Sequence, residues 1–145
     1  MPSALILNMS SRNYLHQEEK RGEGLRLRQL PNLAAPGRLS QLNFSRNDIR
    51  CLPPRLADAQ QLQMLDLSHN KIARIELLGA IPSLKFLNLS HNLIAEVPQE
   101  IIHLVQLENL DLSFNHLATL GSVRALKEVF RIRLVDKGGF VEINI

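Results

Sequence analysis

The sequence has a single cysteine, no tryptophan and few aromatic residues. The lone thiol, Cys51, excludes an intramolecular disulfide, so no covalent cross-link within the chain stabilises the fold. Aromatic residues make up only 4% of the chain, whereas hydrophobic residues make up 45%. Aliphatic side chains must therefore fill the core. At 145 residues, the length predicts one domain.

Long apolar segments are also absent. No stretch approaches the roughly 20 apolar residues of a membrane-spanning helix. The first residues, MPSALILNMSS, lack the basic segment and the apolar length of a signal peptide. Together with the single cysteine, these features predict an intracellular protein, cytoplasmic or nuclear, with no membrane partner.

Basic residues are concentrated at the N-terminal end of the chain. Residues 1–38 carry six Lys/Arg and three Asp/Glu, whereas residues 39–128 carry eight and nine. The N-terminal segment therefore carries +3, which equals the net charge of the whole chain, and the central part is close to neutral. A nucleic-acid surface needs a basic stripe on the body of the fold. The charge distribution therefore disfavours nucleic acid as the main partner.

Four segments share the pattern L-x-x-L-x-L-x-x-N-x-L, with Phe or Ile at some Leu positions. They are Leu39–Ile49, Leu62–Ile72, Leu84–Ile94 and Leu107–Leu117. Their asparagines are spaced 23, 22 and 23 residues apart: Asn47, Asn70, Asn92 and Asn115. A fixed period of this length indicates a repeat architecture, in which each unit packs on its neighbours.

This tandem pattern resembles the leucine-rich-repeat family. The resemblance implies an α/β solenoid, a short right-handed arc with a parallel β-sheet on its concave face and short helical or 3-10 turns on its convex face. The 22-residue repeats resemble the phosphatase-regulator and ciliary subclass. The 23-residue repeats, with a Pro beside the extra residue at Pro53 or Pro98, resemble intracellular Ras-pathway scaffolds.

The pattern also has a physical interpretation. Alternating leucines predict a short strand with one buried face. The Asn that follows each strand stands where the chain must turn, and its amide both donates and accepts hydrogen bonds. We therefore expect the four template asparagines to form a buried structural ladder that satisfies backbone groups of the turn.

Three regions follow from these assignments. Residues 1–24 are expected to hold an irregular N-terminal cap strand, at residues 4–9, and a polar loop. Residues 25–128 hold the repeats, beginning with a Leu where the first template Asn would stand. Residues 129–145 are expected to form a degenerate last strand, 129–135, and a C-terminal hairpin cap with a turn at 136–139.

In the family that the sequence resembles, the outward residues of the strands line a concave face that usually binds proteins. The template predicts three outward columns here. They are Gln41, Met64, Phe86, Asn109 and Arg131; Asn43, Asp66, Asn88, Asp111 and Arg133; and Ser45, Ser68, Ser90, Ser113 and Val135. The expected partner-binding residues are Met64, Asp66, Phe86, Asn88, Asn109, Asp111, Arg131 and Arg133, because an apolar centre with charges around it is typical of interfaces.

The sequence gives only weak support for a metal site or a catalytic nucleophile. His69 and His91 occupy equivalent positions in adjacent repeats, near Asp66 and Asp111, and two imidazoles with a carboxylate can bind zinc. However, Ser-His-Asn is also a common sequence at these positions of the repeat pattern. No nucleophile elbow or oxyanion device accompanies the Ser-His pairs. We therefore expect no catalytic residue, no metal and no cofactor.

These observations favour a non-catalytic, monomeric interaction module, a scaffold or regulatory subunit, that binds a protein partner on its concave face. The identity of the partner is not encoded in the pattern. One alternative is a ribonucleoprotein component that contacts RNA or an acidic partner through the basic N-terminal residues Lys20, Arg21, Arg26, Arg28 and Arg38. Another is a fragment or splice form of a longer protein.

Overall fold

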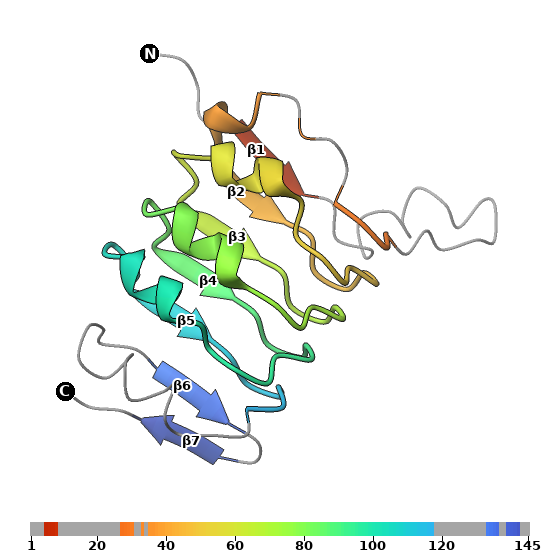
Figure 1. The fold of residues 1–145 in the computed structure, drawn as a ribbon, viewed down its shortest axis with the longest axis vertical. Helices are drawn as coiled ribbons and strands as arrows, with labels where there is room; N and C mark the ends of the chain where they lie inside the picture. The colour runs from red at the N-terminus through yellow and green to blue at the C-terminus, as the bar shows by residue number, and fades with distance from the viewer. Residues whose placement is uncertain are drawn as a thin grey trace.

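The computed structural model describes residues 5–8, 27–30, 33, 35–117, 133–136 and 139–142. Five short parallel strands lie side by side in chain order (Figure 1): β1 (Leu5–Asn8), β2 (Leu39–Asn43), β3 (Met64–Asp66), β4 (Phe86–Asn88) and β5 (Asn109–Asp111). The connections contain four 3-10 turns: η1 (Pro36–Arg38), η2 (Pro54–Asp58), η3 (Glu76–Ala80) and η4 (Gln99–His103). Among the described residues, no helix is long and apolar enough to cross a membrane. The predicted solenoid of parallel strands and short turns is confirmed.

Aliphatic side chains fill the space between the sheet and the 3-10 turns. The central leucines of the strands, such as Leu65 and Leu87, are at most 2% exposed. On the other side of the core, the apolar positions that the sequence places three or four residues apart are buried as well. In one repeat these positions are Ile72, Ile75, Leu78, Ile81 and Leu84. Because each repeat contributes the same set, the core is a continuous column, with Phe44 as the aromatic residue among the buried side chains described.

The four template asparagines form the predicted ladder. The amide group of Asn70 donates to the backbone carbonyls of Phe44 and Leu67, at 2.9 and 3.0 Å, and its oxygen accepts the N–H of Ile49 at 3.0 Å. Asn92 and Asn115 repeat this arrangement one and two repeats later. Each amide thus joins its own turn to the preceding repeat, where it satisfies buried backbone groups.

The ladder extends into the N-terminal part of the chain. The N–H of Leu27 donates to the side-chain oxygen of Asn47 at 3.0 Å, as the N–H of Ile49 does to Asn70. Leu27 therefore occupies the position that the apolar spacing assigned to it. The strand expected at residues 4–9 is observed as β1, which pairs in parallel with β2.

At the other end, β6 (Arg133–Asp136) and β7 (Gly139–Glu142) form an antiparallel hairpin. The sequence predicts a turn between these strands, from 136 to 139. Among the described residues, the hydrogen-bonded parallel sheet ends at β5 and does not include β6. Residues 129–132 of the expected last strand lie outside the described residues. The function of the hairpin as a cap for the core stays a prediction.

Neighbouring 3-10 turns pack closely on the convex side. Gly79, in η3, is buried against the first turn of η4. A Cβ atom at position 79 would lie 2.7 Å from the Cβ of Glu100 and 2.8 Å from its carbonyl carbon. Backbone cannot move aside as a flexible side chain does, so this position requires glycine for close approach.

Replacing a ladder asparagine should destabilise the fold. In an Asn70→Leu variant, the buried N–H of Ile49 loses its acceptor. The carbonyls of Phe44 and Leu67 each lose one of two amide donors and keep the other, from Asn47 and Asn92. We expect a loss of about 1–3 kcal/mol in the free energy of unfolding, measured by urea denaturation. Asn109→Leu is the matched control, because Asn109 is exposed on β5. Equal stability of the two variants would contradict the structural function of the ladder.

A methyl group at position 79 should also destabilise the fold. Gly79→Ala forces η3 away from the backbone of Glu100, at a cost of about 1–3 kcal/mol. Gly37→Ala is the matched control, because its Cβ would meet only the carbonyl oxygen of Asp58, at an ordinary 3.7 Å. Thermal melts of both variants should show a clear decrease for position 79 and little change for position 37. A similar decrease for both would show that close packing of η3 on η4 is not the cause.

Candidate functional site

The register of the sheet aligns the outward side chains of neighbouring strands. Met64 pairs with Phe86, and Asp66 pairs with Asn88. The same register continues to β2 and β5, so that two rows cross the sheet: Gln41, Met64, Phe86 and Asn109, and Asn43, Asp66, Asn88 and Asp111. We call these eight residues the strand face. Members of one row are neighbours at about 4.8 Å.

The centre of the strand face is apolar and shallowly hollowed. Met64 and Phe86 are 41% and 40% exposed, although the leucines that follow them in sequence are buried. Their side chains line a hollow of about 270 Å³, together with side chains of the second row. An exposed Met beside an exposed aromatic ring is more apolar than a strand needs for its solvent-facing side. These two residues therefore form an exposed apolar patch at the centre of the strand face.

The second row is held in place by local hydrogen bonds. The side-chain oxygen of Asp66 accepts the backbone N–H of Ser68 at 2.9 Å, and Asn88 accepts that of Ser90 at 3.0 Å. Asn43 and Asp111 make the equivalent bonds. The sequence-based prediction assigns Asp66, Asn88 and Asp111 to partner binding and does not include this structural contribution. Bonds from Asx side chains to the residue two positions on are a recognisable turn device, so the Asx-x-Ser spacing was the available signal.

The prediction of a third outward column is wrong for the serines. Ser45, Ser68, Ser90 and Ser113 are between 5% and 9% exposed. Strand alternation ends at the Asx residue, and the bond from its side chain to the serine N–H turns the chain inward. Small side chains fit this tightly packed turn. The strand face is therefore two rows wide, and the serines do not contribute to it.

Two expected members of the site, Arg131 and Arg133, follow β5 in the chain. Arg131 lies outside the described residues. Arg133 begins β6, which pairs with β7 rather than with the five-stranded sheet, and its side chain is not described. The continuation of the two rows onto these arginines stays a prediction.

A stack of three rings along the loop edge was not anticipated. The rings of His69 and His91 lie 4.1 Å apart with an interplanar angle of 11°, and those of His91 and Phe114 lie 4.2 Å apart at 12°. Each of these residues immediately precedes a template Asn and has a positive φ, between 54° and 55°. Repeat equivalence could have predicted this stack, because the fold gives all three residues the same backbone conformation.

The stack has a consequence for metal binding. In two parallel imidazoles, the nitrogen lone pairs lie in the ring planes and run side by side. They do not converge on a single ion in this arrangement, so the pair lacks the geometry of a zinc site. Within the described residues, no three His, Cys, Asp or Glu side chains are grouped closely enough to hold a metal.

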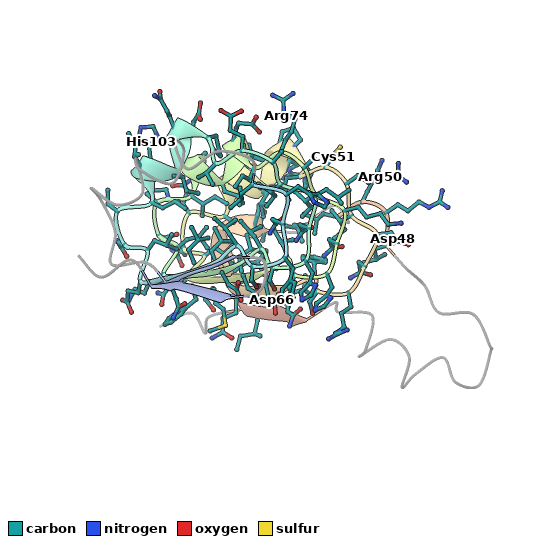
Figure 2. All side chains as sticks on the ribbon, turned by 90° about the horizontal axis from the view of Figure 1, so that it is seen from below. Asp48, Arg50, Cys51, Asp66, Arg74 and His103 are labelled. Atoms are coloured by element: carbon teal, nitrogen blue, oxygen red, sulfur yellow. The ribbon has the colours of Figure 1, made fainter. Side chains whose placement is uncertain are left out.

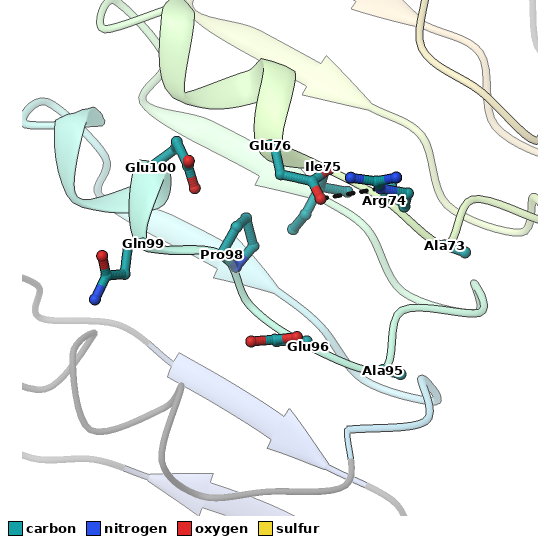
Figure 3. A pocket seen from close by; sticks show the side chains of 9 residues that line it. All are labelled: Ala73, Arg74, Ile75, Glu76, Ala95, Glu96, Pro98, Gln99 and Glu100. Atoms are coloured by element: carbon teal, nitrogen blue, oxygen red, sulfur yellow. Dashed lines mark hydrogen bonds and ion pairs between the residues drawn. The ribbon is translucent and has the colours of Figure 1, made fainter.

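A larger hollow, of about 640 Å³, lies between the segments that lead into η3 and η4 (Figure 3). Its lining includes Arg74, Glu76, Glu96 and Glu100. Arg74 and Glu76 already pair with each other, at 3.1 Å between Nε and Oε1. A backbone hydrogen bond, with a further contribution from Arg74, lowers the pKa of the Glu76 carboxyl. Nothing here combines a nucleophile with a base, and the exposed ion pair is a common surface feature.

The two hollows lie on different sides of the molecule. Figure 2 shows Asp66 at the sheet and Arg74 and His103 on the side of the 3-10 turns. The larger hollow is lined by charged side chains, two of which, Arg74 and Glu76, pair with each other. The strand face instead has two exposed apolar side chains on a rigid sheet. Because apolar contact area contributes most to protein association, the strand face is the better candidate for binding.

Comparisons with known proteins agree with this architecture. A family model described as leucine-rich repeats (2 copies) matches residues 60–100 and 82–128. An internalin from Listeria monocytogenes has a similar structure, with a TM-score of 0.65 and 26% identity over 75% of this chain and 33% of that one. A leucine-rich-repeat protein from Leptospira interrogans has a TM-score of 0.57 and 33% identity over 68% of this chain and 28% of that one. This chain therefore spans at most about a third of either protein. No curated protein sequence matches it.

The hydrogen bonds of the second row predict how its residues tolerate substitution. Asp66→Asn should leave stability within about 0.5 kcal/mol of the wild type, because Asn43 and Asn88 accept the same bond from their serines. Asp66→Ala should cost about 1 kcal/mol, because the N–H of Ser68 loses its acceptor. Chemical denaturation of both variants measures the difference. If alanine is tolerated as well as asparagine, the bond is not stabilising.

Proposed function

Because this chain is a leucine-rich-repeat protein, we propose that it is a non-catalytic module that binds a protein partner on its strand face. In this proposal the chain holds its partner as a scaffold or regulatory subunit. We also propose an intracellular location, because the chain has a single cysteine and therefore no intramolecular disulfide. Leucine-rich-repeat domains are generally protein-interaction modules. The observation that carries the proposal is the exposed pair Met64 and Phe86, aligned on adjacent strands.

Rigidity of the sheet supports this function. The leucines beneath the strand face are buried, and the ladder asparagines fix the turn at the end of each strand. A surface held in this way loses little conformational entropy when a partner binds. Phe86 is the expected anchor, because an aromatic ring contributes a large contact area and has few rotatable bonds. Met64 beside it adapts to the shape of the partner.

The proposal is tested by placing a photo-crosslinking benzoyl-phenylalanine at position 86 in cells that express the protein. We expect a protein adduct from this position. The same probe at Val105 is the control, because Val105 is 73% exposed but lies just after η4, away from the strand face. An adduct that forms at position 105 and not at 86 would show that the partner binds elsewhere.

A second measurement uses a paired substitution. Phe86→Ala with Asp111→Lys removes the anchor and reverses one charge on the strand face, so the partner identified by crosslinking should bind at least tenfold more weakly. The wild type and the double variant must have equal melting temperatures, so that a loss of binding does not reflect unfolding. Undiminished binding of that partner to the double variant would contradict the proposal. Loss of the adduct on ribonuclease treatment would instead favour the ribonucleoprotein alternative.

A further inference from the structure

The second row of the strand face carries two charges that the fold does not require. All four residues of this row accept a hydrogen bond from the serine two positions on, at 2.9–3.0 Å. Asn43 and Asn88 make this bond with an amide oxygen, whereas Asp66 and Asp111 make it with a carboxylate. An uncharged side chain is therefore sufficient for the turn, and the hydrogen bond to the serine does not require the two negative charges.

The described surroundings do not neutralise these carboxylates. Within the described residues, no Lys, Arg or His side chain lies within ion-pair distance of Asp66 or Asp111. The strand face contains no basic residue. Elsewhere on the described surface, Asp48 pairs with Lys71 at 3.0 Å and Glu76 pairs with Arg74 at 3.1 Å. Asp66 and Asp111 therefore have no cationic neighbour among the described side chains.

The position of the charges relative to the apolar centre is also defined. Asp66 on β3 and Asp111 on β5 flank Asn88 on β4, so two strand spacings, about 9.6 Å, separate them. Met64 and Phe86 stand two residues earlier on their strands, about 6.7 Å away along the strand direction. The same hollow includes all four residues. The strand face thus combines a bulky apolar contact with two fixed negative charges.

We propose that the partner segment bound by the strand face is a basic, apolar peptide. It presents two cationic side chains about 10 Å apart to Asp66 and Asp111, and a bulky apolar side chain to Met64 and Phe86. In an extended polyproline II chain, which rises about 3.1 Å per residue, that separation corresponds to three residues. Arginine suits both positions, because its guanidinium binds a carboxylate and stacks on an aromatic ring. The inference rests on the proposed function, since it specifies the partner of the same surface.

The test uses a pair of 12-residue peptides that differ only at the two charged positions. One contains Arg-Leu-Pro-Arg and the other contains Glu-Leu-Pro-Glu, each within a neutral Gly-Ser background. Titration into the isotopically labelled full chain, followed by amide chemical shifts, detects weak binding and places it on the sheet. We expect the arginine peptide to perturb β3, β4 and β5 and to bind at least tenfold tighter than the glutamate peptide, with a preference that decreases as salt increases.

Charge-neutral variants separate this site from other acidic surfaces. Asp66→Asn with Asp111→Asn keeps both bonds to the serines and removes both charges, so binding of the arginine peptide should weaken about threefold to thirtyfold. Glu96→Gln with Glu100→Gln is the matched control, because it removes the same charge from the other hollow. Equal binding of the two peptides, equal weakening in the two variants, or shifts centred on η3 and η4 would each overturn the inference.

Failure of the inference can be distinguished from failure of the proposed function. If a protein adduct forms at position 86 but the arginine peptide does not bind, the strand face is an interaction surface for a partner of different chemistry. If the adduct forms only at position 105, the proposal that the partner binds the strand face is wrong. Binding of the arginine peptide that persists in Phe86→Ala with unchanged affinity would show that the apolar centre does not contribute, and would overturn that part of the inference.

Discussion

The hydrogen bonds of the template asparagines are the constraint on which the rest of the structure depends. Each amide joins the turn after one strand to backbone groups of the preceding repeat, and each of the four asparagines is at most 7% exposed. An apolar residue at such a position would leave a buried backbone N–H without its acceptor and would remove one donor from each carbonyl that the amide binds. Because the ladder fixes the turns at a constant offset, the strands stack in register. The alignment of Met64 with Phe86 follows from that register.

The sequence predicted the parts of the fold that this constraint controls. The eleven-residue pattern identified the strands, the buried leucines and the ladder, since all three have a fixed place relative to each Asn. Leu27, in a repeat without a template Asn, stands at an apolar position of the pattern, and its N–H donates to Asn47 as the N–H of Ile72 does to Asn92. What failed was the extension of strand alternation past the Asx residue. The serines there are turned inward by a local bond to the Asx side chain, and periodicity contains no information about where a strand stops.

The stack of His69, His91 and Phe114 illustrates a second limit. The residues were visible as equivalents, but their contact depends on backbone conformation. A positive φ at each position directs the three side chains the same way, and the repeat spacing then brings the rings within 4.1 and 4.2 Å. The two histidines were weighed as metal ligands only as the weaker alternative to an ordinary turn, and the ring stack was not among the expectations. Sequence reasoning identifies which positions are equivalent, and the structure is needed to learn what that equivalence places together.

The same distinction explains why the partner is harder to infer than the fold. Most residues of a repeat are fixed by packing or by the ladder, so they are similar in any protein of this architecture. The choices that remain open are the outward residues of the strands and the charge state of the Asx row. In this chain those choices are Met64 and Phe86, and aspartate rather than asparagine at positions 66 and 111. Each carboxylate is already oriented by its bond to a serine N–H, so part of the entropy cost of ordering it is met during folding. A cationic partner therefore meets charges that are in position before it arrives, and this is the physical reason to expect selectivity for charge from so small a surface.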